Sequence, residues 1–374
     1  MAVTAVAPIA AKDRDALAIW WDLRAREAGL DGIDALMREF ALPRYRLAQI
    51  YRAATKEFVE HCRDITVLPV ALRTTLDSRL RLSSVAVERE ATSADGQTTK
   101  FLFDLDGGKQ VEAVLMRHHG GRTTACISSQ AGCALKCDFC ATGQGGFMRN
   151  LNALEIFDQA VCVARRARTE GRTLTNLVFM GMGEPFLNYD AVMQSVALLN
   201  DGKGFNLGAR HMTISTAGVV PGIERFASEG IQVNLAVSLH AADDVLRTRL
   251  MPINKKWPIA KLMTAISEYV KATHRKVFYE YLMLAGINDR LQDARQLADL
   301  LGGPLHHVNL IPYNATDAAY TRSSPAAMRR FQEILRERGV PSTIRHTMGD
   351  DIAAACGQLR AEADATARSR TAQA

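Results

Sequence analysis

The chain has 374 residues, of which 48% are hydrophobic and 23% charged, a composition that excludes both a membrane protein and a disordered one. This length allows one large domain and a smaller one. Lysine and arginine exceed aspartate and glutamate by six, which favours a polyanionic partner, although an ordinary basic surface would give the same balance. The opening MAVTAVAPIAAKDRD lacks a basic lead and no apolar run has the length of a membrane span, so we expect a cytoplasmic protein without membrane contact.

Four segments flank or precede the main domain. Residues 1–30 are expected to form an N-terminal extension. Residues 31–84 carry apolar side chains at helical spacing, interrupted by Pro43 and Pro69, and predict a small helical domain. Residues 85–118 alternate apolar and polar side chains around DG and DGG turn signals and predict an antiparallel hairpin linker. Residues 352–374 are expected to form a C-terminal segment that carries Cys356 and ends in a disordered tail.

Residues 119–351 predict the main domain. Apolar strands alternate there with amphipathic helices, which indicates repeated βα units and a parallel sheet. The predicted strands lie in TTACISS, TLTNLVFM, HMTISTA, VNLAVSL, KVFYEYLML and HHVNLIPY. A closed barrel needs about eight strands. The sequence therefore predicts an α/β fold with a partial (βα)6 barrel and a small N-terminal helical accessory domain, and with its chemistry at the carboxyl ends of the strands.

The segment CALKCDFC spaces Cys133, Cys137 and Cys140 as C-x3-C-x2-C just beyond the first predicted barrel strand. Cysteines crowded in this way, in a chain without an export signal, indicate metal or redox chemistry rather than a disulfide framework. Structural zinc usually takes four protein ligands, and no suitably spaced fourth one follows. Three thiolates instead suit a 4Fe-4S cluster with one iron open to a substrate, while zinc remains the alternative.

This cysteine spacing, with Phe139 directly before the third cysteine, resembles the radical S-adenosylmethionine (SAM) enzymes, and the resemblance extends over residues 122–346. It implies that Gly183 and Glu184 in GMGEP contact the amino group of SAM, for which a carboxylate is a suitable partner. It implies further cofactor contacts at other strand ends, namely Ser215, Ser238, Leu239, His240 and Asn314. Taken singly, each of these is as typical of a turn or a helix cap.

Four longer motifs narrow the resemblance: CISSQAGCALKCDFCATGQGGFMRNL, FMGMGEPFLNYD, LMPINKK and GDDIAAACGQL. They are similar to the radical SAM methyltransferases that modify carbon 2 of adenine in large-subunit ribosomal RNA and in transfer RNA. The resemblance implies that Cys356 carries the methyl group, Cys126 releases the RNA by forming a disulfide, and Glu112 removes the carbon-2 proton. It implies two SAM molecules per turnover. From the sequence alone, Glu112 reads as an exposed strand residue and the two cysteines as buried packing residues.

The same resemblance implies the partners. The RNA partners are 23S rRNA, at the peptidyl transferase centre, and tRNA, at an adenosine beside the anticodon. A one-electron donor such as flavodoxin is also implied, and the enzyme is expected to be a monomer. The helical domain is expected to recruit RNA, although Ala53 stands where the family often carries tryptophan. Candidate phosphate contacts, which would position the RNA rather than select its sequence, are Arg44, Arg46, Lys255 and Lys256.

Three alternatives remain open at this level. The related adenine carbon-8 methyltransferases, which confer antibiotic resistance, share the cluster spacing and both catalytic cysteines. An iron-sulfur electron carrier would not need Glu184, Ser215, Asn314 or Cys356, so binding of SAM separates it from an enzyme. A non-catalytic RNA-binding module would explain the charge but not the cluster cysteines.

Overall fold

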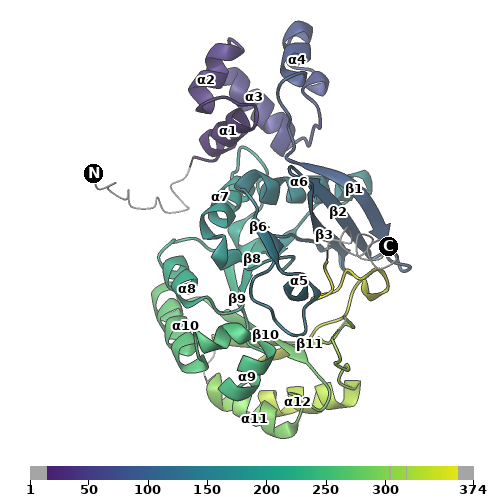
Figure 1. Ribbon diagram of the computed structural model, residues 1–374, viewed down its shortest axis with the longest axis vertical. Coiled ribbons are helices and arrows are strands. Elements are labelled where there is room, and N and C mark those ends of the chain that lie inside the picture. The colour runs from purple at the N-terminus through teal and green to yellow at the C-terminus, as the bar shows by residue number, and fades with distance from the viewer. Residues whose placement is uncertain (1–14, 303–304, 317, 361–374) are drawn as a thin grey trace, which may run out of the picture.

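The computed structural model describes residues 15–302, 305–316 and 318–360. One sheet of ten strands runs through the molecule in the order β1-β2-β3-β4-β7-β8-β9-β10-β11-β12 (Figure 1). Its parallel part confirms the six predicted barrel strands and adds a short seventh. These strands are β4 (Thr123–Cys126), β7 (Asn176–Phe179), β8 (Met212–Thr216), β9 (Asn234–Ser238), β10 (Val277–Met283), β11 (His306–Pro312) and β12 (Ser342–Ile344).

Helices connect these parallel strands, as expected of βα units. In chain order they are α6 (Ala153–Thr169), α7 (Tyr189–Asn200), α8 (Val220–Ala227), α9 (Asp244–Leu250), α10 (Ile259–Thr273), α11 (Leu291–Leu300) and α12 (Pro325–Glu337). The longest of them, α6, begins with a capping box. Asn152 accepts a hydrogen bond from the backbone N–H of Glu155, whose carboxylate accepts one from the N–H of Asn152. Among the described residues, no helix is long and apolar enough to cross a membrane.

The predicted hairpin linker is a three-stranded part of the same sheet. Strands β1 (Val85–Thr92), β2 (Thr98–Leu105) and β3 (Lys109–Arg117) are antiparallel, and β3 pairs with β4 so that Val114 lies opposite Cys126. The turns fall at the predicted glycines, and Gly96, Gly107 and Gly108 all have positive φ. The segment thus extends the barrel sheet instead of leading into it.

The helical domain begins before residue 31, which corrects the expectation of an N-terminal extension over residues 1–30. It consists of α1 (Ala16–Glu27), α2 (Gly32–Glu39), α3 (Arg44–Thr55) and α4 (Val70–Asp77). Asp15 caps α1 by accepting from the N–H groups of Leu17 and Ala18. Trp20 and Trp21 of α1 are fully buried, and Trp20 meets Tyr51 of α3 edge to face.

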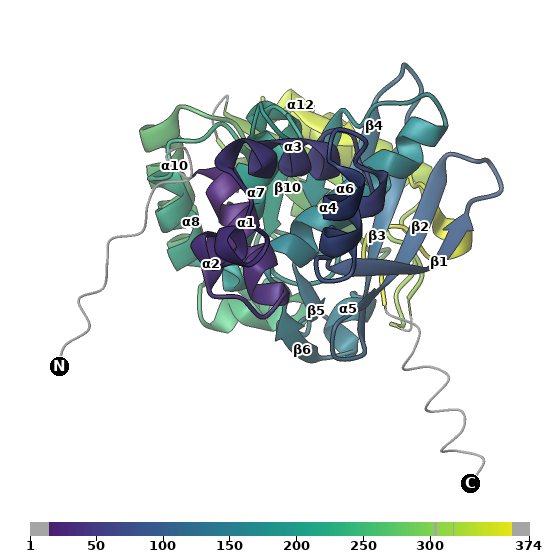
Figure 2. The same ribbon diagram turned by 90° about the horizontal axis from the view of Figure 1, so that it is seen from above.

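The helical domain is fixed to the barrel by buried polar contacts, and Figures 1 and 2 show its purple helices beside α6 and α7. Arg24 of α1 is fully buried, and its guanidinium pairs with Asp158 of α6 at 2.6 Å. The Tyr51 hydroxyl donates to Asp201, which follows α7, at 2.9 Å. The domain therefore has a fixed orientation relative to the site. The first fourteen residues and the tail expected to be disordered lie outside the described residues.

Candidate active site

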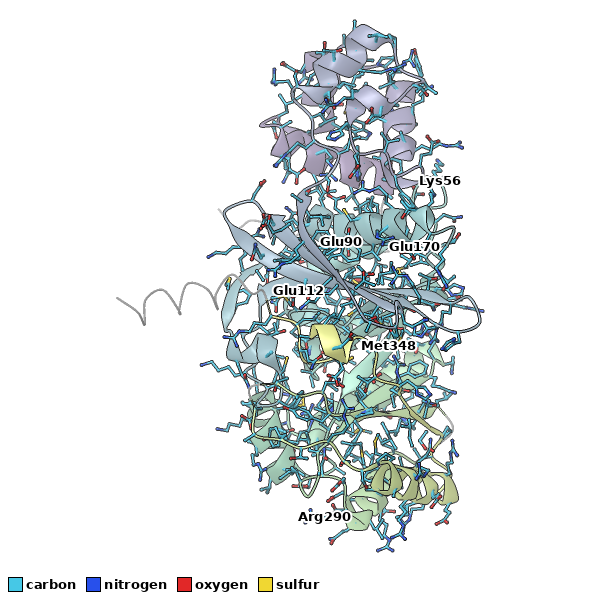
Figure 3. The ribbon with its side chains drawn as sticks, turned by 90° about the vertical axis from the view of Figure 1, so that its right-hand side faces the viewer. Lys56, Glu90, Glu112, Glu170, Arg290 and Met348 are labelled. Atoms are coloured by element: carbon cyan, nitrogen blue, oxygen red, sulfur yellow. The ribbon has the colours of Figure 1, made fainter. Side chains whose placement is uncertain are left out.

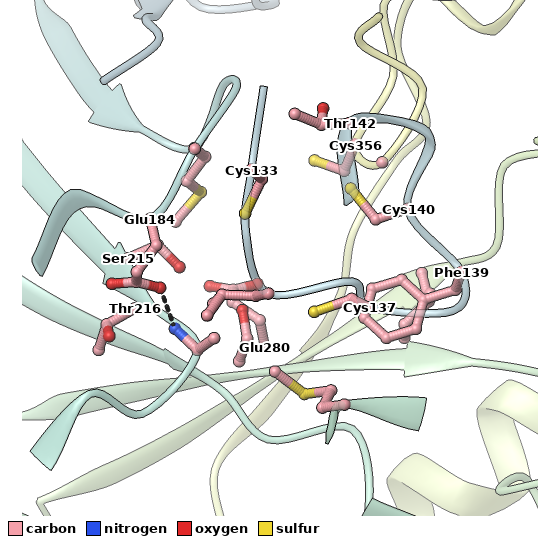
Figure 4. A pocket seen from close by; sticks show the side chains of 18 of the residues that line it. Cys133, Cys137, Phe139, Cys140, Thr142, Glu184, Ser215, Thr216, Glu280 and Cys356 are labelled. Atoms are coloured by element: carbon pink, nitrogen blue, oxygen red, sulfur yellow. Dashed lines mark hydrogen bonds between the residues drawn. The ribbon is translucent and has the colours of Figure 1, made fainter. Parts of the chain in front are cut away.

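The three cysteines of CALKCDFC lie on the loop between β5 (Gln130–Gly132) and α5 (Ala141–Gln144). Strand β5 pairs with β6 (Phe147–Asn150), and Gly132 must be glycine because a Cβ there would lie 2.0 Å from the carbonyl oxygen of Gly146. This short pair of strands anchors both ends of the loop. Figure 4 shows all three cysteine side chains at one cavity, which we call the first hollow.

The first hollow suits a cluster better than a single ion. Within the described ranges, no three His, Cys, Asp or Glu side chains are close enough together to bind one metal ion, so the zinc alternative has no assembled site there. In a cubane cluster each thiolate binds a different iron atom, so the sulfurs need only face the same space. Burial raises the pKa values of Cys133 and Cys137 because a desolvated thiolate is disfavoured. Iron ligation would supply the positive charge that these thiolates require.

GMGEP forms the side of the first hollow at the end of β7. Gly183 has a φ of 101°, and a Cβ there would lie 2.5 Å from the side chain of Gln130, so only glycine allows this approach. Gln130 accepts from the N–H of Glu184 at 2.8 Å. The Glu184 carboxylate accepts from Phe186 at 3.1 Å and from Ala217 at 2.7 Å, the second bond being dashed in Figure 4. These backbone donors aim a buried carboxylate at the hollow.

The predicted contacts at the next strand ends divide into two groups. Ser215 of β8, Ser238 of β9 and His240 line the first hollow. Leu239 is fully buried and does not line it, so only its backbone remains available. The His240 ring is fixed, since its Nδ1 accepts from the N–H of Leu282 at 3.0 Å and its ring meets Phe139 edge to face.

Cys356 lies where the first hollow meets a second one. The second hollow is lined by residues of β3, β4 and β11, by residues that follow β11 and β12, and by the C-terminal segment. Cys126, Asn314, Arg345 and His346 are among them. Cys356 lines both hollows. Its segment is fixed by hydrogen bonds on both flanks, from the Ala141 N–H to the Gly357 oxygen at 2.8 Å and from the Asn314 amide to the Cys356 oxygen at 3.2 Å. The structure thus places the lone C-terminal thiol beside the predicted cluster loop.

Cys126 and Cys356 are free thiols that face the second hollow together. Cys126 is the last residue of β4 and is buried. Burial is the main cause that raises the pKa of Cys126, and the nearby Cys356 is the second cause. Although Cys356 is exposed to the two hollows, protein atoms surround it closely, and this desolvation raises its pKa as well. The two sulfur atoms are therefore close enough to influence one another.

Asn314 and Glu112 lie in places that the sequence did not predict. Asn314 lines the second hollow rather than the first, and its amide holds the Cys356 segment. Glu112, expected to be exposed, is only 1% exposed. Its carboxylate accepts from the Arg360 N–H at 2.7 Å and pairs with Lys100 at 3.0 Å. Figure 3 labels Glu112 on the antiparallel strands, beside the C-terminal segment, which is yellow.

Sequence reasoning missed two further buried residues, one that lines the site and one that lies behind it. Glu280 of β10 is buried, lines both hollows and accepts from the Asn309 amide at 2.9 Å. Arg247 of α9 is fully buried behind the strand ends. The sequence did carry a signal for Glu280, because a glutamate inside the apolar run KVFYEYLML indicates a buried carboxylate. The sequence carried no such signal for Arg247, because arginine on an amphipathic helix is usually solvated.

Comparison with known proteins agrees with this geometry. The family model described as the radical SAM superfamily matches residues 127–301. A crystal structure of a radical SAM methyltransferase from Sphaerobacter thermophilus has a TM-score of 0.86 and 47% identity, covering 95% of this chain and 100% of that one. Two curated relatives are both named probable dual-specificity RNA methyltransferase RlmN. The one from Symbiobacterium thermophilum is 44% identical over 88% of this chain and 89% of its own, and the one from Chloroflexus aurantiacus is 45% identical over 88% and 90%.

The partial barrel and its cysteine loop thus define a radical SAM enzyme, whose cofactors are a 4Fe-4S cluster and SAM. Within that superfamily the chain belongs to the RlmN family of RNA methyltransferases. This membership sets aside the electron carrier and the non-catalytic RNA-binding module.

We expect SAM to bind more weakly as the pH falls through about 7. Burial raises the pKa of Glu184 to about 7, so the carboxyl group is largely neutral at lower pH and attracts an ammonium group less strongly. From about pH 8 to about pH 6 the ionised fraction of Glu184 falls to about one-tenth of its value, which predicts an affinity for SAM that is about tenfold weaker. Equilibrium binding of SAM to the anaerobic holoenzyme measures it. Glu184→Gln should bind weakly without this slope, and a flat profile for the unaltered protein would exclude the ion pair.

Proposed function

We propose that this enzyme methylates carbon 2 of adenine in 23S rRNA and in tRNA, with Cys356 as the methyl carrier and Cys126 as the releasing thiol. One observation supports this mechanism above the others. Cys356 lies at the boundary between the hollow of the cluster cysteines and the hollow that contains Cys126. A carrier has to reach a methyl donor on one side and a releasing thiol on the other.

The target carbon explains why a carrier is needed. Carbon 2 of adenine is electron-poor and has no lone pair, so it cannot attack a sulfonium methyl group directly. Cys356 can, because a thiolate is a good nucleophile. After losing its proton, its sulfur would take the methyl group from one SAM molecule, which leaves as S-adenosylhomocysteine. Cys133, Cys137 and Cys140 would hold the 4Fe-4S cluster, which would supply the one electron needed to cleave a second SAM molecule into methionine and a 5′-deoxyadenosyl radical.

The remaining steps take place on the two thiols. The 5′-deoxyadenosyl radical would take a hydrogen atom from the S-methyl group and leave as 5′-deoxyadenosine. The carbon radical on Cys356 would add to carbon 2, joining the RNA to the protein through a methylene, and the adduct would then lose the carbon-2 proton to a base and return one electron to the oxidised cluster. The Cys126 thiolate would then attack the sulfur of Cys356, forming a disulfide and breaking the bond between sulfur and the methylene, and the released carbanion would take up a proton to give methylated RNA. Glu112 is the proposed base for the carbon-2 proton. Its carboxylate accepts from Arg360, so this role requires the C-terminal segment to shift.

The helical domain is proposed to recruit RNA, because it presents exposed cationic and aromatic side chains on a rigid support. Arg44 is exposed, and Tyr45 is 59% exposed with the Arg46 guanidinium 4.9 Å from its ring centre. Arg46 also donates to the Val67 oxygen, so it is partly committed within the domain. Lys255 and Lys256 are exposed near α9 and remain candidate phosphate contacts. A one-electron donor such as flavodoxin and a monomeric state complete the proposal.

Mass spectrometry of RNA nucleosides tests the assignment. A strain lacking the gene should gain 2-methyladenosine in both 23S rRNA and tRNA when complemented with this chain, and the Cys356→Ala variant should restore neither. Nucleosides from the uncomplemented strain give the baseline. Appearance of 8-methyladenosine instead would assign the chain to the carbon-8 reaction, and methylation of one RNA class alone would remove the dual specificity.

A further inference from the structure

The buried side chain of Arg247 makes its hydrogen bonds to uncharged oxygen atoms. Its guanidinium donates to the carbonyl oxygens of Ala217 at 2.8 Å, Ser238 at 3.2 Å and Leu239 at 3.2 Å. It also donates to the side-chain oxygen of Asn254 at 2.8 Å. These carbonyls lie at or just after the ends of β8 and β9, which carry the predicted SAM contacts. One side chain thus holds both ends in place.

Within the described part of the chain, Arg247 makes no ion pair with a carboxylate. Asp244 lies near it on α9, but its carboxylate accepts from the Asn254 amide and the Ile259 N–H, both at 2.8 Å. Burial lowers the pKa of Arg247 to about 10, which still leaves it charged at neutral pH. Burying a cation without a partner is costly, so an anion is expected nearby in the working enzyme.

The cysteine loop is the nearest place for such an anion. The N–H of Asp138 donates to the oxygen of Leu250, the last residue of α9, at 3.0 Å. Cys137 packs in the same apolar cluster as Leu250 and Met251, and Met251 lines the first hollow. The N–H of Met251 donates to the backbone oxygen of Arg247 at 2.7 Å, which ties this residue to the same cluster. The guanidinium therefore lies behind the loop that would hold the iron-sulfur cluster.

We propose that Arg247 is the counter-charge of the cluster and, through its backbone contacts, the positioning residue for SAM. The inference rests on the family's cluster and on the proposed cofactor contacts at β8 and β9. Three thiolates give the cluster site a negative charge that grows by one electron on reduction. A fixed cation in a poorly polarisable interior stabilises the reduced form more than the oxidised form. Arg247 should therefore make the cluster easier to reduce.

Two substitutions separate the charge from the hydrogen bonds. Arg247→Gln removes the charge and keeps one amide donor, whereas Arg247→Lys keeps the charge and loses the planar fork. The matched control is Arg249→Gln, which removes an exposed charge from the same helix. The anaerobic holoenzymes are compared by redox titration followed by electron paramagnetic resonance, and by equilibrium binding of SAM. Thermal unfolding and iron content show that each variant is folded and loaded.

For Arg247→Gln we expect the equilibrium constant for cluster reduction to fall at least tenfold, which is 59 mV for one electron. Arg247→Lys should keep a potential close to that of the unaltered enzyme but bind SAM about tenfold more weakly. Arg249→Gln should change neither. An unaltered potential in Arg247→Gln overturns the counter-charge role, as does an equal loss of potential in both variants. If the unaltered chain bound no cluster, the proposed function itself would be wrong. That result differs from an unaltered potential in Arg247→Gln, which would overturn only the role of Arg247.

Discussion

Replacing Cys126 by alanine should leave RNA covalently attached to Cys356. The substitution removes the thiolate that expels the product, while the carrier thiol and the cluster cysteines stay in place. Protein isolated from cells should then show a nuclease-sensitive increase in mass, and peptide mapping should locate the attached nucleotide at Cys356. Release of methylated RNA should fall below detection, because no other cysteine lines the second hollow with Cys356 among the described residues.

Cys356→Ala should fail in a different way. Without the acceptor, neither protein methylation nor RNA product can form, and no RNA should be trapped. The matched control is Cys162→Ala, since Cys162 is buried on α6 away from both hollows. It should lose stability on the order of 1 kcal/mol from a small cavity and keep its turnover. Normal turnover by Cys126→Ala without trapped RNA would rule out the releasing role.

Replacing Cys133, Cys137 and Cys140 together by alanine should abolish the cluster and all cleavage of SAM. The loop would keep its anchors at β5 and α5, so the loss would come from missing iron ligands and not from a lost fold. Iron and sulfide analysis, the visible absorption spectrum and formation of 5′-deoxyadenosine measure the effect.

The control for the cluster experiment is Cys62→Ala, a buried cysteine of the helical domain, which should keep a full complement of iron and sulfide. Each single alanine variant of the three loop cysteines should also lose cleavage, because every thiolate binds its own iron atom. Retention of an intact cluster by the triple variant would remove the assignment of these cysteines.

Local patterns in the sequence determined the parts of this protein that depend on neighbouring residues. The barrel strands were predicted because each is a short apolar run next to an amphipathic helix, and all six occur in the parallel sheet. The turns between β1, β2 and β3 were predicted because glycine accepts positive φ. The cysteine loop was recognisable because Cys133, Cys137 and Cys140 lie within eight residues, so their spacing alone places them on one loop.

Only the tertiary structure decided the features that join distant segments. Helix α1 was missed because its buried face includes Arg24, whose partner Asp158 lies on α6, so no apolar stripe marks it. Glu112 is buried in contact with Arg360, a residue of the C-terminal segment far along the chain. Arg247 likewise depends on carbonyls from two other loops. Side-chain periodicity reports which face of an element is apolar, whereas topology and packing decide what covers that face, and this is why burial of the charged groups could not be read from the sequence.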